Sequence, residues 1–149
     1  MDCHYMKIAL EEARKAYNKG EVPIGAIVVQ NNKIIGRGHN LKESLQDATA
    51  HAEILALRQA YKHTGGWRLT ASTLYVTIEP CAMCAGAILQ SRVSRLVIGA
   101  MDPKAGACGS ILNLLNNERF NHQVEISRGI LEDESANIIK NFFIELREK

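Results

Sequence analysis

The sequence lacks long apolar runs and has little excess of either charge. Its first residues mix acids with bases and contain no continuous apolar stretch, so we expect neither a signal peptide nor a membrane-spanning segment there, and no membrane partner. A cytoplasmic protein is the expectation. The formal net charge is only +2. This is short of the strongly basic balance of a dedicated nucleic-acid-binding protein, but it leaves RNA binding open.

Internal repeats, linkers and low-complexity segments are also missing from the chain. A length of 149 residues with 46% apolar residues suits one hydrophobic core. We therefore predict a single domain spanning residues 1–149.

Cysteine is scarce, with four residues in the chain. Only Cys81 and Cys84 form a Cys-x-x-Cys pair, whereas Cys3 and Cys108 stand apart. In a reducing compartment this pattern favours a metal site over disulfides. We expect no chemistry of Cys3 and Cys108.

What is present is an alternation of strand and helix patterns, with Asn31-Asn32 as a tight turn between two strands. Pro80 is expected at the first position of the helix that carries the Cys-x-x-Cys pair. Helices are predicted at about 3–18, 49–63, 81–91, 111–115 and 132–147. Strands are predicted at 23–30, 33–40, 73–80, 95–100 and 124–127. This order predicts an α/β fold, a three-layer α/β/α sandwich around a mixed five-stranded sheet.

Three residues form a candidate zinc site: His51, Cys81 and Cys84. A catalytic zinc is held by three protein ligands drawn from imidazole and thiolate donors, and its fourth position is left for water. Cysteines three apart on a helix lie on one face, so both sulfurs can reach one ion, and His51 arrives from the start of the preceding helix. The positive ends of the two helices favour the thiolate forms.

Glu53 is the candidate catalytic acid and base. Two thiolates and a neutral imidazole cancel the charge of Zn²⁺, so its bound water is acidified less than in an all-histidine site. A nearby base is therefore needed to remove the proton of this water. An isolated Cys-x-x-Cys can equally be a structural or redox pair, and an isolated His-x-Glu carries little information. Together, His51-Ala52-Glu53 and Pro80-Cys81-Ala82-Met83-Cys84 match the motif H-x-E…P-C-x-x-C, which is typical of nucleobase deaminases.

The chain resembles the bacterial tRNA-specific adenosine deaminases over nearly its whole length. Besides the zinc motifs, the resemblance is carried by GEVPIGAI at 20–27, TAHAE at 49–53, TLYVT at 73–77, EPCAMCAGAI at 79–88, DPKAG at 102–106 and FNH at 120–122. It implies a cytidine-deaminase-like fold and a homodimer with one zinc ion per subunit. It also implies conversion of adenosine to inosine at the wobble position, with the anticodon stem-loop of tRNA as partner.

The resemblance further implies six substrate-binding residues: Ile24, Asn40, Ala52, Asp102, Lys104 and Arg147. Asn40 would hydrogen-bond the base, and the two apolar residues would wall its pocket. Asp102 and Lys104 would contact the anticodon-loop backbone, and Arg147 would meet phosphate. These side chains have suitable chemistry, since an amide offers a donor and an acceptor, a carboxylate accepts from a 2′-hydroxyl, and cations bind phosphate.

Two other functions fit the same motifs. A deaminase of free bases, nucleosides or nucleotides on this fold is compatible with the small net charge. A zinc-stabilised RNA-binding module without catalysis would keep its RNA function after Glu53→Ala, whereas a deaminase would lose activity and retain zinc.

Overall fold

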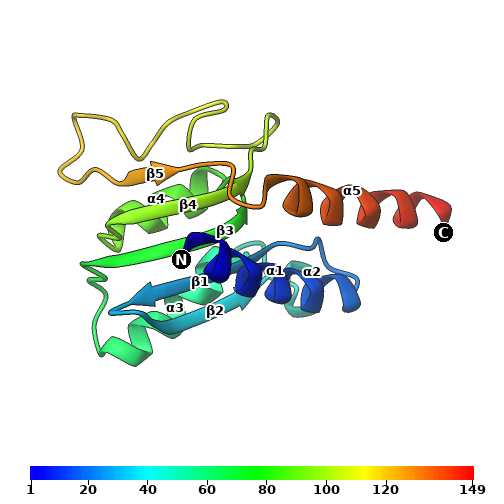
Figure 1. The fold of residues 1–149 in the computed structure, drawn as a ribbon, viewed down its shortest axis with the longest axis horizontal. Coiled ribbons are helices and arrows are strands. Elements are labelled where there is room, and N and C mark those ends of the chain that lie inside the picture. The colour runs from blue at the N-terminus through cyan, green and yellow to red at the C-terminus, as the bar shows by residue number, and fades with distance from the viewer.

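Five strands form one mixed sheet in the computed structural model, which describes all residues from 1 to 149 (Figure 1). The strands are β1 (Gly25–Gln30), β2 (Lys33–His39), β3 (Ser72–Ile78), β4 (Arg95–Ala100) and β5 (Glu125–Ser127). Their order in the sheet is β2-β1-β3-β4-β5. The pairs β1–β2 and β1–β3 are antiparallel, whereas β3–β4 and β4–β5 are parallel. The predicted mixed five-stranded sheet is confirmed.

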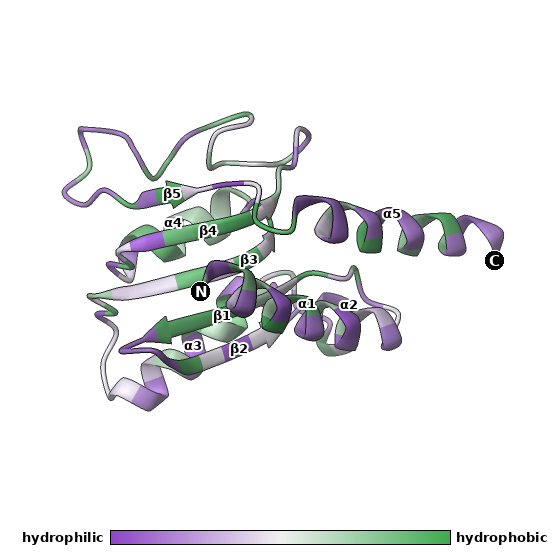
Figure 2. Ribbon diagram, viewed as in Figure 1, coloured by the Kyte–Doolittle hydropathy of each residue, from purple (hydrophilic) through white to green (hydrophobic).

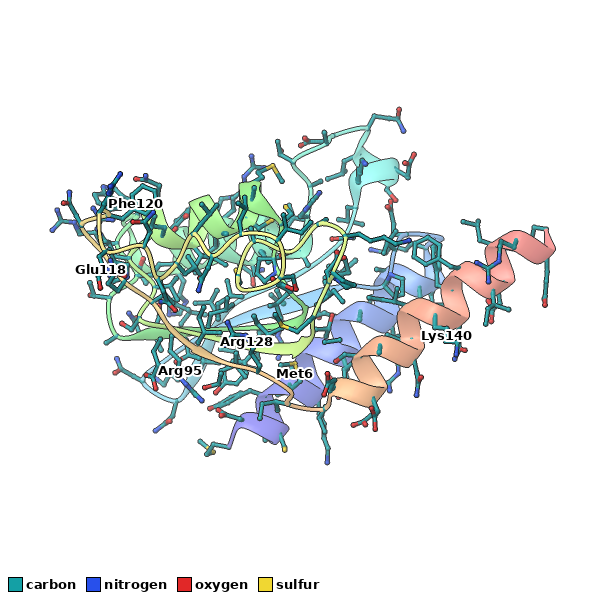
Figure 3. All side chains as sticks on the ribbon, turned by 90° about the horizontal axis from the view of Figure 1, so that it is seen from above. Met6, Arg95, Glu118, Phe120, Arg128 and Lys140 are labelled. Carbon is teal, nitrogen blue, oxygen red and sulfur yellow. The ribbon has the colours of Figure 1, made fainter.

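Helices cover both faces of this sheet. The elements α1 (Asp2–Asn18) and α5 (Glu132–Glu148) lie on one face, and α3 (Ala52–Thr64) and α4 (Ala82–Gln90) lie on the other (Figures 1 and 3). This arrangement confirms the three-layer α/β/α prediction. A fifth, one-turn helix, α2 (Lys42–Leu45), follows β2 and was not predicted.

Two apolar clusters, one on each face, hold the layers together. The larger cluster of 20 buried residues lies between the sheet and the pair α3–α4, and the smaller one of seven lies under α1. Because strand side chains alternate in direction, Val28 belongs to the larger cluster and its neighbours Ile27 and Val29 belong to the smaller one. A strand covered on both faces is apolar throughout, as Figure 2 shows for most of β1 and β4.

The hairpin between β1 and β2 sets the position of β2, on which the start of α3 packs. Asn31 and Asn32 both have positive φ, at 53° and 60°. Asparagine tolerates this left-handed backbone, which a two-residue hairpin turn of the favoured twist requires. On the next strand, a Cβ atom at Gly38 would lie 2.3 Å from the carbonyl oxygen of Ala52. Glycine therefore lets the start of α3 lie directly on β2.

Two details differ from the sequence predictions. First, α3 begins at Ala52 and α4 begins at Ala82, so His51 and Cys81 occupy the N-cap positions, and Pro80 lies before the helix instead of in its first turn. Second, the segment 111–115 is not a helix, because the amides of Ile111 and Leu112 bond back to the carbonyl of Gly106. Separately, none of the helices combines the length and the apolar character needed to cross a bilayer.

Candidate metal centre and substrate groove

The candidate functional residues gather at one end of the sheet. Ile24 precedes β1, Asn40 follows β2, and Glu79 follows β3. The register pairs Gly25 with His39 and Ile78 with Ala100, so these strand ends lie next to one another. The N-termini of α3 and α4 begin from the same region. Loops at the carboxyl ends of parallel strands are where α/β proteins usually build their sites.

His51, Cys81 and Cys84 form the metal-ligand cluster of the structure. Their potential ligand atoms all lie within 4.8 Å of one another. The Nδ1 atom of His51 lies 3.7 Å from the Cys81 sulfur and 3.5 Å from the Cys84 sulfur. Tetrahedral zinc with ordinary bond lengths separates nitrogen and sulfur ligands by about 3.6 Å. The donor set and its spacing therefore fit one zinc ion.

The cluster is polarised toward thiolate even without a metal. A hydrogen bond from the Cys84 thiol, followed by one from the His51 ring, lowers the pKa of Cys81 well below its ordinary value. The same bond to Cys81, together with burial, raises the pKa of Cys84. The hydrogen bond to Cys81 also raises the pKa of His51. The three groups thus share charge closely, and a divalent cation would let both sulfurs ionise.

Glu53 lies one residue inside α3 and is buried, with 3% of its surface exposed. Burial raises the pKa of its carboxyl group to about 7, and the group is close enough to Cys84 to exchange a hydrogen bond with it. A carboxyl group whose pKa is near neutrality can both accept and donate a proton under physiological conditions. The geometry thus places a suitable proton carrier beside the ligand cluster.

Asn40 links the two residues predicted to wall the base pocket. Its backbone amide donates to the carbonyl of Ile24 at 3.2 Å, and its side-chain Oδ1 accepts from the amide of Ala52 at 2.8 Å. The oxygen of the Asn40 side chain is therefore already hydrogen-bonded to the N-terminus of α3. The Nδ2 group is left as the part of the amide that can donate to a ligand.

A groove of about 490 Å³ brings together three of the predicted substrate residues, Ile24, Asp102 and Lys104. Its volume is in the range of small-molecule sites, and none of the metal-cluster residues lines it. Phe143 on α5 completes one wall. The Oδ1 atom of Asp102 accepts from the backbone amides of Lys104 and Ala105, so this carboxylate first shapes its own loop. The full lining is Val22, Ile24, Ile78, Ala100, Met101, Asp102, Pro103, Lys104, Ala136, Ile139 and Phe143.

The last turn of α5 stands apart from this group. Arg147 is exposed there and lines no part of the groove. Phe142 is buried and packs edge-on against Tyr17 of α1, with ring centroids 5.7 Å apart, whereas Phe143 is exposed on its outer side. In Figure 1 the helix extends beyond the end of the sheet where the site lies. The last turn of the helix, which contains Arg147, thus lies beyond the end of the sheet.

Comparison with known proteins places this site in a family. A family model described as MafB19-like deaminase matches residues 2–147. The tRNA-specific adenosine deaminase of Bacillus subtilis (strain 168) is 56% identical over 145 residues, which cover 97% of this chain and 90% of that protein. The chain belongs to the tRNA-specific adenosine deaminase family. The family's protein from Haemophilus influenzae is 49% identical and covers 97% of this chain and 84% of its own length.

Solved structures of similar fold include a member of the same family. A structure from work on A-to-I editing by tRNA deaminases at the wobble position has a TM-score of 0.87 and 45% sequence identity, covering 91% of this chain and 98% of the other. A guanine deaminase from Nitrosomonas europaea has a TM-score of 0.76 at 25% identity, covering 93% and 82%. The fold is thus shared with a deaminase of a free base, while sequence similarity is higher to the tRNA deaminases.

Two buried carboxylates near the site were missed by the sequence reasoning. Glu21 is 2% exposed and accepts from the backbone amides of Glu43 and Ser44 at the start of α2. Glu79 is equally buried and binds backbone amides of the loop after β4. An acid directly before Pro80-Cys81 was the available signal for the second. Neither its burial nor its partners can be read from the sequence.

Proposed function

We propose that this chain hydrolyses adenosine to inosine at the wobble position of a tRNA anticodon. The observation that carries the proposal is the convergence of His51, Cys81 and Cys84 with buried Glu53, in a chain 56% identical to a tRNA-specific adenosine deaminase. The reaction consumes one water and releases one ammonia. A cytoplasmic location follows from such a substrate.

The three ligands would hold one Zn²⁺ per subunit. The fit rests on two sulfurs and one imidazole nitrogen spaced as a tetrahedral site requires. When bound, zinc supplies Lewis-acid activation of the attacking water. Three protein ligands leave one position for that water, which is the pattern of catalytic rather than structural zinc sites.

Glu53 would carry the protons of the reaction. The carboxylate accepts a proton from the attacking water and delivers it to the ring nitrogen next to the carbon that is attacked. It then accepts the second proton of the water, from the hydroxyl group now on the attacked carbon, and passes it to the leaving amine, so that ammonia departs and a carbonyl remains. A pKa of about 7 supports both directions of transfer, because neither form is strongly disfavoured.

The polar substrate residues would act as one neutral donor, two cations and one acceptor. The Nδ2 group of Asn40 would donate to an acceptor on the purine edge, with Ile24 and Ala52 beside the base. Lys104 and Arg147 would meet phosphates of the anticodon stem-loop, and the free oxygen of Asp102 would accept from a ribose hydroxyl. The groove that contains Ile24, Asp102 and Lys104 supports this arrangement.

We also propose that the protein acts as a homodimer. Several large apolar side chains are exposed, including Trp67, Ile111 and Leu112 at 49–58% exposure. A second copy could cover exposed apolar side chains of this kind and remove them from water. Sedimentation equilibrium tests this assembly.

Incubation with separate substrates tests the reaction. The protein is mixed with an anticodon stem-loop carrying adenosine at the wobble position, and in parallel with free adenine, guanine, cytosine and cytidine. Inosine in the stem-loop alone is expected. Turnover of a free base with an inert stem-loop would instead identify a free-base deaminase. No ammonia from the wild-type protein, with RNA binding unchanged in Glu53→Ala, would identify the zinc-stabilised binding module.

A further inference from the structure

The carboxylate of Glu79 is the most heavily hydrogen-bonded side chain near the site. It follows β3, stands two residues before the ligand Cys81, and has 2% of its surface exposed. Its Oε1 accepts from the amide of Asp102 at 2.9 Å and from the hydroxyl of Ser110. Its Oε2 accepts from the amides of Cys108 at 3.0 Å and Ser110 at 2.9 Å. No salt bridge joins Glu79 to a cation.

All four donors belong to one loop, residues 102–110, which we call the substrate loop. We call residues 80–84, which contain the candidate ligands Cys81 and Cys84, the metal turn. The substrate loop is hydrogen-bonded to it directly, because the Ala107 amide donates to the carbonyl of Pro80 at 2.9 Å. The guanidinium group of Arg128 also holds this loop, because it donates a hydrogen bond to the carbonyl of Cys108 at 2.8 Å. The loop that begins with Asp102 and Lys104 is therefore attached to the turn that carries Cys81.

Gly106 shows how closely the loop approaches the carboxylate. A Cβ atom at this position would lie 2.1–2.4 Å from the Glu79 carboxyl atoms. Any side chain there would displace either the carboxylate or the loop. Only glycine allows the loop to wrap around Glu79 as it does.

All the hydrogen-bond partners of Glu79 are donors, so both oxygens of its carboxyl group act as acceptors and are held in place. Hydrogen bonds to a charged acceptor are stronger than neutral ones. Since the donors are neutral, the bonds fix the loop without using a cation that could otherwise bind phosphate.

We infer that Glu79 is a positioning residue that fixes the substrate loop to the metal turn, and so presents Asp102 and Lys104 to the RNA in a preformed geometry. The inference rests on the proposed function, because it assigns Glu79 to the binding of the same substrate. Glu79 is not one of the candidate metal ligands and does not itself line the groove, which it reaches only through the backbone amide of Asp102. Its effect is therefore expected in substrate binding and not in the chemical step.

Two variants test this positioning, one with a change in Glu79 and one with a change in the substrate loop. Glu79→Gln preserves the side-chain shape but replaces one acceptor oxygen with an amide group that faces N–H donors. Gly106→Ala keeps Glu79 and all four donors but inserts a methyl group where the carboxylate lies. The second variant preserves the test if the first fails to fold. Asp2→Asn is the matched control, since it changes a hydrogen-bonded carboxylate at the far end of the sheet.

Zinc-loaded proteins are compared by steady-state deamination of the anticodon stem-loop, metal content and amide hydrogen exchange. For Glu79→Gln and Gly106→Ala we expect KM to rise about tenfold with kcat within about threefold, as expected for the loss of hydrogen bonds to a charged group. The amides of Asp102, Cys108 and Ser110 should exchange at least about tenfold faster, with zinc content unchanged. The Asp2→Asn control should match wild type in KM and in exchange of these amides.

Unchanged KM and unchanged exchange in both variants would overturn the inference. A fall in kcat together with loss of zinc would also overturn it, because Glu79 would then support the metal turn alone. If the wild-type protein does not deaminate the stem-loop, the proposed function fails by itself. In that case, amide exchange still shows whether Glu79 fixes the loop, so the two failures can be told apart.

Discussion

The two ends of the β3–β4 pair are built from different interactions. At the carboxyl end, the buried Glu79 binds backbone amides and a hydroxyl, and no cation neutralises it. At the opposite end, Asp2 forms a two-pronged salt bridge with Arg95 at 2.9 and 2.7 Å, and Tyr75 donates to it as well. Figure 3 shows Arg95 at the end of the molecule away from the tip of α5.

This difference separates a functional end from a structural end. A partly exposed ion pair contributes little to stability and is weakened by salt. Buried carboxylates with several backbone donors fix loops without using a cation, and under the proposed function Lys104 and Arg147 would thus stay available for phosphate. The comparison predicts that changes at the carboxyl end alter activity strongly and that changes at the other end alter stability slightly.

Removal of the metal should have the largest effect. A chelator that strips the cluster of His51, Cys81 and Cys84 should abolish deamination, because water activation is lost. The melting temperature should also fall, since binding of a metal to the native state stabilises it. Activity and thermal unfolding are measured before chelation, after it, and after zinc is restored. Full activity of the metal-free protein would contradict the assignment.

Replacement of the proton carrier should have the next largest effect. Glu53→Gln should lower kcat by about 10²–10⁴-fold, the usual contribution of a positioned acid or base. Zinc content should remain that of the wild type, because Glu53 is not in the ligand cluster. Glu11→Gln, an exposed glutamate on α1, serves as the control and should leave kcat unchanged. Loss of zinc in Glu53→Gln would show that the residue acts on the metal site instead.

Removal of single cations should have a moderate effect that depends on salt. Lys104→Ala and Arg147→Ala should each weaken binding of the anticodon stem-loop several-fold. Each should lower the slope of log K against log salt by about 0.7, as expected for one phosphate contact to a single strand. The measurement is fluorescence anisotropy at several salt concentrations. Lys7→Ala, at the exposed start of α1, should leave the slope unchanged, and an equal change there would refute a localised RNA surface.

The smallest effect is expected at the opposite end of the sheet. The hydrogen bond from Arg95 holds the pKa of Asp2 below its ordinary value. A lowered folded-state pKa contributes stability above the unfolded value, and that stability is lost as pH falls through the folded value. Asp2→Asn should therefore cost about 1 kcal/mol or less near pH 7 and lose less stability than wild type between about pH 5 and pH 3. Urea unfolding across this range measures the difference, and an identical pH dependence would contradict it.

Local patterns were sufficient for most of the secondary structure. The Asn31-Asn32 turn, the strand 95–100 and the helix before Gly65 are visible because turn residues and apolar periodicity act over a few residues. The segment 111–115 was predicted as a helix and forms none. Its leucines follow a helical pattern, but its amides are used by Gly106, an interaction set by the fold of the loop.

The sequence by itself determined the proposed chemistry of this protein, because zinc ligation and proton transfer require particular residue types at particular spacings, and His51, Glu53, Cys81 and Cys84 have those types and spacings. Only the tertiary structure decided how the substrate groove is assembled. The ends of β1, β2, β3 and β4 are distant in the chain and meet through sheet register. The partners of Glu79 lie 23–31 residues away from it, so its role depends on contacts that local sequence does not encode.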